Sequence, residues 1–138
     1  MTSLTFKNLD NNKKQLIEQV LLEEFSHYTL PTAKVSRIVK AASIARGAFY
    51  KYFDDINDAY LYTYGLAIQN IHADFQAPGE QTNADYLNEV TNFVDKINNS
   101  KYYDLMKLHI TTNEAFLASQ SEEPSQKFDL LPWTTGLG

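Results

Sequence analysis

Residues 32–53 read TAKVSRIVKAASIARGAFYKYF, and their order predicts two short helices joined by a tight turn. From Lys34 to Ala42, apolar residues recur at steps of three and four, so one helical face carries Val35, Ile38, Val39 and Ala42. Thr32 is predicted as the N-cap of this helix. Ser43 and Ile44 interrupt the pattern, and a second helix is predicted from Ala45 to Tyr52. This layout is typical of proteins that read the DNA major groove.

The second helix of this pair carries an informative set of outward side chains. With Ile44, Phe49 and Phe53 as inward anchors, the outward residues are Arg46, Gly47, Ala48, Tyr50 and Lys51. Small residues let a helix backbone approach the groove floor, and long donors reach base edges and phosphates. The alternative is a small helical corner of a core with solvated charges, and spacing alone does not separate the two interpretations.

A longer pattern surrounds this stretch. Ile17 is followed eight residues later by Phe25, Ile38 lies thirteen residues further on, and residues 47–53 read GAFYKYF, which has the form G-x-F-Y-x-Y-F. From Ile17 to Phe53 the chain resembles, without a gap, the N-terminal domain of the TetR family of bacterial transcriptional repressors. The resemblance implies an all-α protein with a three-helix DNA-binding head, which contains the helix-turn-helix, followed by a short helical body for ligand binding or dimerisation.

The resemblance also implies roles for individual residues. Lys34 and Ser36 would lie near phosphates at the start of the first helix of the pair, and Tyr50 and Tyr52 would touch the sugar-phosphate backbone. The reading face would comprise Ala45, Arg46, Gly47, Ala48 and Lys51. The implied partner is a double-stranded DNA operator of pseudo-palindromic sequence, bound by a homodimer and released when a small-molecule effector repositions the long fourth helix.

Four positions depart from the family pattern. Thr29 and Ser43 stand where the family commonly has Gly, which bears on turn geometry, and Lys34 stands where Thr or Ser is usual. Ile56 replaces a Lys that would contact phosphate. Asp54 and Asp55 beside it would repel the DNA backbone, so weak non-specific affinity is expected.

Charge is distributed unevenly along the chain. Eight basic and four acidic residues precede Asp54, and four basic and thirteen acidic residues follow from there, which gives net charges of +4 and −9. A polyanion would therefore be attracted to the N-terminal third and repelled by the remainder.

Composition indicates a soluble cytoplasmic protein. The 138 residues are 43% hydrophobic, which suffices for a real core, and the absence of Cys excludes disulfides and thiolate metal sites. The N-terminal residues lack an apolar secretory segment, and no stretch approaches the ~18 apolar residues that a membrane span needs.

Three further helices are predicted beyond the head, over residues 57–75, 82–98 and 101–119. The second has an apolar stripe of Leu87, Val90, Val94 and Ile97, and the third has an inward stripe of Tyr102, Met106, His109, Ile110, Asn113, Phe116 and Leu117. The predicted domains are a DNA-binding head over 1–54, an incomplete regulatory body over 55–119 and a tail or linker over 120–138. Family chains usually continue through further dimerisation helices, so a monomer or weak dimer is expected here, from a chain that is either naturally short or cut.

Enzymatic chemistry finds little support in the sequence, and neither a cofactor nor a metal is expected. The histidines at 27, 72 and 109 form no His-Glu-x-x-His pair, and the sequence has no nucleophile elbow and no phosphate-cradling Gly-rich loop. His72 and Asp74 point to different helix faces at a separation of two. His109 is either a hydrogen-bonded core residue or part of a small-molecule cavity with Tyr103, Met106 and Phe116.

The prediction from sequence is therefore a DNA-binding transcriptional regulator, a repressor whose body senses a small molecule. The alternative is a TetR-like helical module that has lost productive DNA affinity and binds a protein partner, as Ile56, Asp54 and Asp55 suggest.

Overall fold

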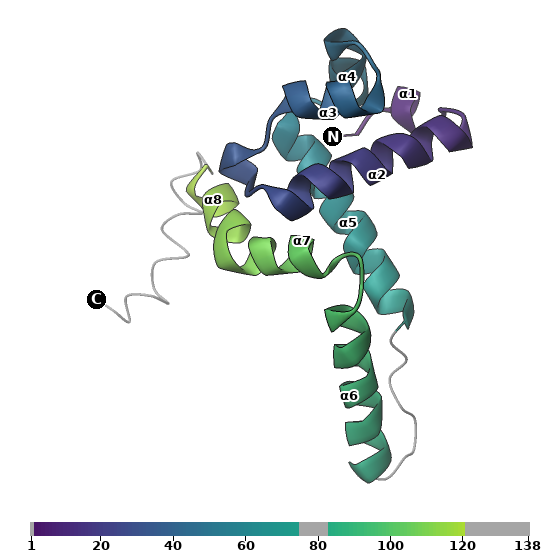
Figure 1. Cartoon of the computed structure of the whole chain (residues 1–138), viewed down its shortest axis with the longest axis vertical. Helices are drawn as coiled ribbons and strands as arrows, with labels where there is room; N and C mark the ends of the chain where they lie inside the picture. Colours follow the sequence, from purple (N-terminus) through teal and green to yellow (C-terminus); the bar gives the residue numbers. More distant parts are fainter. Residues whose placement is uncertain (1, 75–82, 121–138) are drawn as a thin grey trace.

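The computed structural model describes residues 2–74 and 83–120, and this part of the chain is all-α, as the sequence predicted (Figure 1). Four short or medium helices form the head: α1 (Leu4–Lys7), α2 (Asn11–His27), α3 (Val35–Ala42) and α4 (Arg46–Tyr52), with the 3₁₀ turn η1 (Leu30–Thr32) between α2 and α3. The body comprises α5 (Ile56–Asp74), α6 (Asn83–Asn98), α7 (Tyr103–Leu108), the π-helical turn η2 (His109–Asn113) and α8 (Glu114–Ser119).

Aromatic and aliphatic side chains from all four head helices form one core. The most deeply buried members that the head contributes are Phe6, Ile17, Leu21, Phe25, Ile38, Phe49 and Phe53, and the same core continues into α5 and α7 through Ala59, Tyr60, Ala67 and Leu105. The sequence did not predict α1, which is four residues long. Ser3 caps it by accepting a hydrogen bond from the Phe6 amide, and Ser3 N donates to Tyr52 O at 2.9 Å. Phe6 then packs 4.9 Å from the Phe53 ring, so α1 locks the end of α4 to the core.

The helix-turn-helix has the predicted helices but a different N-cap. Thr32 ends η1, and its hydroxyl donates to Thr29 O at 3.0 Å. The N-cap of α3 is Lys34, which makes no side-chain cap hydrogen bond. The prediction for Thr32 is wrong because α3 begins only at Val35, and the Thr32 hydroxyl is held within η1 by Thr29. The Lys34 amide donates to the Glu24 carboxylate on α2 at 3.0 Å.

Ser43 makes the tight turn between α3 and α4. Its backbone adopts the left-handed conformation, with φ 57° and ψ 43°, and its amide donates to Lys40 O. The turn geometry that glycine would favour is thus kept without glycine.

The long helix α5 starts at the head, crosses behind α2 and links the head to the other helices of the body (Figure 1). Its start is fixed by acidic side chains: Asp55 Oδ1 accepts from the Asp58 amide, and Asp58 Oδ2 accepts from the Asp54 amide, both at 2.8 Å. This reciprocal arrangement is close to a capping box. Part of the acidity after the head is therefore structural.

Two predicted apolar stripes in the body require correction. On α6, Leu87 and Val94 are exposed at 63% and 46%, whereas Val90 and Ile97 are half-buried, so only part of that stripe is covered within the described chain. The segment predicted as one helix over 101–119 is α7, η2 and α8, with a π turn in its middle. Ile110, which the predicted stripe included, is 73% exposed, and Leu105, which it lacked, is fully buried.

Across the part of the chain that the structure describes, none of the helices is long and apolar enough to cross a membrane.

Candidate nucleic-acid interface

Most of the residues predicted to contact DNA lie on the outer side of the head. Those on α4 and at its N-cap are exposed, namely Ala45, Arg46, Gly47, Tyr50 and Lys51, and so are Lys34 and Ser36 at the start of α3. Ala48 is half-buried against the core. The inward anchors Phe49 and Phe53 are buried, whereas Ile44 is only partly buried. Helix α4 therefore has one face in the core and one polar face in solvent.

Gly47 is not required by packing within the head. A Cβ atom placed on it would meet no other heavy atom within 4 Å, and it is an α-helical residue. Glycine is unfavourable inside a helix by roughly 1 kcal/mol relative to alanine, so its presence here is a local cost. Close approach of another molecule to this face is one physical reason for such a residue.

Arg46 and Tyr50 form a pair on the exposed face. Arg46 Nη2 lies 3.5 Å from Tyr50 Oη, and its guanidinium carbon lies 5.7 Å from the ring centre. The Tyr50 ring in turn packs edge-on against Phe49, with 5.1 Å between ring centres. The core thus supports a phenol that is still 46% exposed. Both side chains can donate to an external acceptor.

Tyr52 differs from the other predicted contact residues. Its side chain is only 6% exposed, and its ring centre lies 5.6 Å from that of Phe6. Tyr52 is three residues after Phe49, which already places it on the inner face of the helix. Its ring therefore serves the core, and little of it is available to a partner.

Arg37 and Glu24 are the residues of this region that sequence reasoning did not single out. Arg37 Nη2 lies 2.8 Å from Glu24 Oε2, and the guanidinium stacks 3.7 Å above the Tyr28 ring centre. The hydrogen bond to Glu24 raises the pKa of Arg37. The available signal was Glu24 itself, which falls on the inward stripe of α2, because a carboxylate at a buried position requires a partner.

The exposed cations of the helix-turn-helix are consequently Lys34, Lys40, Arg46 and Lys51, whereas Arg37 is half-buried in its ion pair. They lie on α3, on α4 and at the N-cap of α3, so the basic character of the head is concentrated on its outer helices.

His109 belongs to a packed polar cluster in the body. Its Nδ1 lies 2.7 Å from Tyr60 Oη, its ring stacks 3.9 Å from the Tyr64 ring, and its Nε2 lies 3.6 Å from a Glu114 carboxylate oxygen. Burial lowers the pKa of His109, with Glu114 acting in the opposite direction, and burial raises that of Tyr60 to about 12. These contacts favour the core-histidine interpretation over the cavity interpretation.

A separate open groove of about 720 Å³ lies where α2, α5 and the start of α7 meet. Its lining is largely polar, with Glu18, Ser26, Asn70, Lys101 and Asp104 among the contributors. No group of three or more potential metal ligands occurs within residues 2–74 and 83–120.

Comparison with known proteins identifies a structural relative. The chain is similar to a TetR family transcriptional regulator from Chloroflexus aurantiacus J-10-FL, with a TM-score of 0.67 and 31% sequence identity; the match covers 76% of this chain and 51% of that one. The chain thus spans about half the length of the regulator it matches. No family model matches the sequence, and no curated protein does. At this TM-score and identity, the resemblance first read from Ile17 to Phe53 is confirmed at the level of the fold, and the chain has the fold of the TetR family of transcriptional regulators.

Proposed function

We propose that the protein is a DNA-binding transcriptional regulator that uses α4 as its reading helix. The observation that carries the proposal is the outer face of α4, where Arg46, Gly47, Tyr50 and Lys51 are exposed on a helix whose other face is fixed in the core. The similarity to a TetR family regulator supports the same function.

In the proposed complex, α4 lies in the major groove. Gly47 and Ala45 allow the helix backbone to approach the bases, and Arg46 reads a base edge, since arginine pairs most often with guanine. Lys34, Ser36, Tyr50 and Lys51 contact the phosphate backbone, which fixes register without reading sequence. Residues 1–54 form the DNA-binding domain and residues 55–119 the regulatory domain.

Regulation and assembly are part of the same proposal. A repressor that reads two half-sites needs two heads about 34 Å apart, which two copies of this chain, expected to be monomeric or weakly dimeric, would supply on the operator. The polar groove between α2, α5 and α7 falls in the size range of small-molecule sites. An effector bound there would touch both the head and the body.

Single substitutions on α4 test this function. Arg46→Ala is expected to weaken binding to a duplex selected from a randomised pool by about 1–3 kcal/mol and to relax preference at one base-pair position. Lys51→Ala is expected to weaken binding to all DNA sequences similarly. It should also reduce the slope of log affinity against log salt concentration by about one unit. Lys107→Ala, an exposed cation on α7, is the matched control. Fluorescence anisotropy at two salt concentrations measures all three.

The rival is a helical protein-interaction module without productive DNA affinity. Its support from Asp55 is reduced because that carboxylate caps α5. Wild-type protein that binds no duplex at low salt would favour the rival. An Arg46→Ala, Lys51→Ala double variant that binds DNA as tightly as wild type would instead remove α4 as the reading helix.

A further inference from the structure

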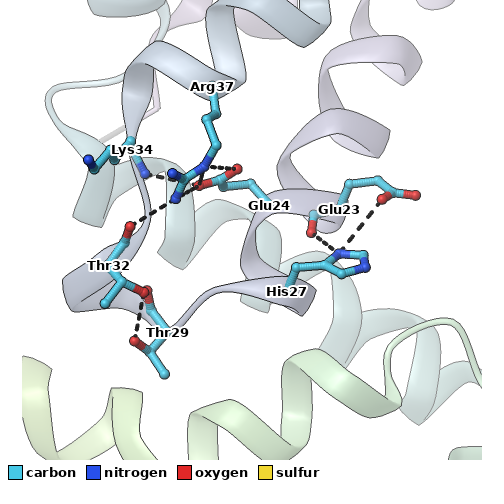
Figure 2. Close-up of polar contacts among 7 residues, drawn as sticks. All are labelled: Glu23, Glu24, His27, Thr29, Thr32, Lys34 and Arg37. Carbon is cyan, nitrogen blue, oxygen red and sulfur yellow. Dashed lines mark hydrogen bonds and ion pairs between the residues drawn. The ribbon is translucent and has the colours of Figure 1, made fainter.

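A nearly buried carboxylate connects three elements at the base of the helix-turn-helix (Figure 2). Glu24, on α2, is only 7% exposed. Its Oε2 accepts from the Lys34 amide at 3.0 Å and from Arg37 Nε at 2.9 Å, and Oε1 accepts from the same Nε at 3.2 Å. One side chain of α2 therefore fixes both the backbone and a side chain at the start of α3.

Arg37 extends the same network to η1. Its Nη2 lies 2.8 Å from Glu24 Oε2 and donates to Thr32 O at 2.9 Å. Figure 2 shows the guanidinium between the Glu24 carboxylate and the Thr32 carbonyl. The Tyr28 ring covers one side of the guanidinium. This geometry needs a planar fork with several donors, which an ammonium group does not provide.

The network also holds the N-cap residue of α3. Lys34 makes no side-chain cap hydrogen bond, and its own amide, which in a capping box donates to a side chain of the same helix, donates to Glu24 of another helix. A side chain within α3 would follow α3 wherever it moved, whereas Glu24 binds the start of α3 only when α3 sits correctly on α2. The first turn of α3 is thereby made dependent on the orientation of the two helices.

Given the DNA-binding function proposed for α4, we infer that Glu24 is a positioning residue for DNA recognition, which acts through Arg37 and the Lys34 amide to set the α3–α4 pair on α2. Glu24 touches no DNA in this role. It fixes where Lys34 and Ser36 meet phosphate, and hence how deeply α4 enters the groove.

The chain offers a matched control in the neighbouring residue. Glu23 is exposed, and Figure 2 shows it paired with His27 on α2, away from α3. Glu24→Gln and Glu23→Gln therefore remove the same charge from adjacent positions, but only the first alters the network. Arg37→Lys is a second test variant, because it keeps the net charge and loses the fork.

The experiment compares affinities for two duplexes of equal length, one selected by the wild-type protein from a randomised pool and one unrelated. Both are measured well below the unfolding midpoint of each variant, with helicity checked by circular dichroism. Glu24→Gln and Arg37→Lys are expected to lower the affinity for the selected duplex tenfold or more, and the affinity for the unrelated duplex less than threefold. Glu23→Gln is expected to change neither. Amide exchange at Lys34 is expected to accelerate in Glu24→Gln without DNA.

Two outcomes would overturn the inference while leaving DNA binding intact. In one, folded Glu24→Gln and Arg37→Lys keep the wild-type ratio between the two duplexes, which would make the network only a stabilising contact. In the other, Glu23→Gln has the same effect as Glu24→Gln, which would assign the change to net charge. If Glu24→Gln does not fold, Arg37→Lys decides alone. Wild-type protein that binds neither duplex would instead refute the proposed function, and the inference with it.

Discussion

Single residues in unusual environments define the helix-turn-helix. Ser43 holds a left-handed backbone conformation, Gly47 sits in a helix with open space beside it, and Glu24 carries a charge into the interior. Each has an identifiable local cost. The cost at Ser43 can be measured with the fewest other effects, because the residue is exposed and its side chain lies outside the core.

Ser43→Gly is expected to stabilise the protein. A left-handed residue with a Cβ costs about 1–2 kcal/mol, and the larger conformational entropy that glycine loses on folding offsets roughly 0.5–1 kcal/mol. The free energy of unfolding should therefore rise by about 0.5–1 kcal/mol in urea titrations. Ala41→Gly, at an exposed site inside α3, should lower it by about 1 kcal/mol. A loss of stability in Ser43→Gly would show that its turn is not strained.

Helices with strong apolar periodicity were predictable from sequence almost to the residue. The helix predicted over 45–52 is α4, Arg46–Tyr52, and the one predicted over 82–98 is α6, Asn83–Asn98. Features that depend on distant contacts were not predictable. Helix α1 has too few residues for a period and exists through its contacts with α4. The π turn η2 has no apolar signal either, and Ile110, one residue after the buried His109, is exposed.

In the candidate site too, features set by local spacing were predictable, and features set by contacts between helices were not. The exposed residues of α4 follow from the burial of Phe49 and Phe53, which the spacing revealed. The backbone contact that the resemblance implies for Tyr52 stays a prediction, and its spacing from Phe49 indicates the largely buried ring that the structure has. The Glu24–Arg37 pair joins residues on separate helices, and one sequence gives no means of choosing that partner among several cations.

The start of α5 allows a test at the scale of the element. Ile56 is half-buried against the core at the position where the resemblance implies a phosphate-binding Lys. Ile56→Lys is expected to raise affinity for duplex DNA several-fold and to steepen its salt dependence by about one unit. Lost apolar burial should cost about 1 kcal/mol of stability, because the lysine stem can stay packed while its ammonium reaches solvent.

Ile56→Gln is the matched control, since it carries a polar stem without charge and should lose similar stability with no gain in affinity. Gel-shift titrations at two salt concentrations compare the three proteins. A lower unfolding midpoint in Ile56→Lys, with unchanged DNA affinity, would contradict the docking geometry in which the start of α5 lies beside the DNA backbone.

At the scale of the whole molecule, η2 joins the body to the head. Asn113 is fully buried, and its Oδ1 accepts from the Leu30 amide, in η1, at 2.7 Å. One turn earlier, His109 meets Tyr60 and Tyr64 of α5. Because η1 also carries the Thr32 carbonyl that Arg37 binds, a continuous set of contacts leads from the body to the start of α3. The orientation of the head is thus tied to the packing of the body.

The stability of this junction is expected to depend on pH through His109. Burial lowers the pKa of His109 from its ordinary value of 6.5, so the fold favours the neutral ring. The stabilisation is therefore fully present above pH 6.5 and is lost as the pH falls below it, because the unfolded chain takes up the proton more readily. The Glu114 carboxylate, which favours the charged ring, reduces the effect without reversing its sign.

Thermal unfolding at pH 7.5 and pH 5.5 measures this dependence. From pH 7.5 to pH 5.5, the unfolding temperature should fall by more in the wild-type protein than in His109→Gln. Glutamine offers hydrogen-bonding groups but does not titrate. His27→Gln, at an exposed site on α2, should behave as wild type, since that ring is not enclosed by the body. If His109→Gln loses as much stability as wild type on acidification, the titration that weakens the fold lies elsewhere, and the head–body junction is not its site.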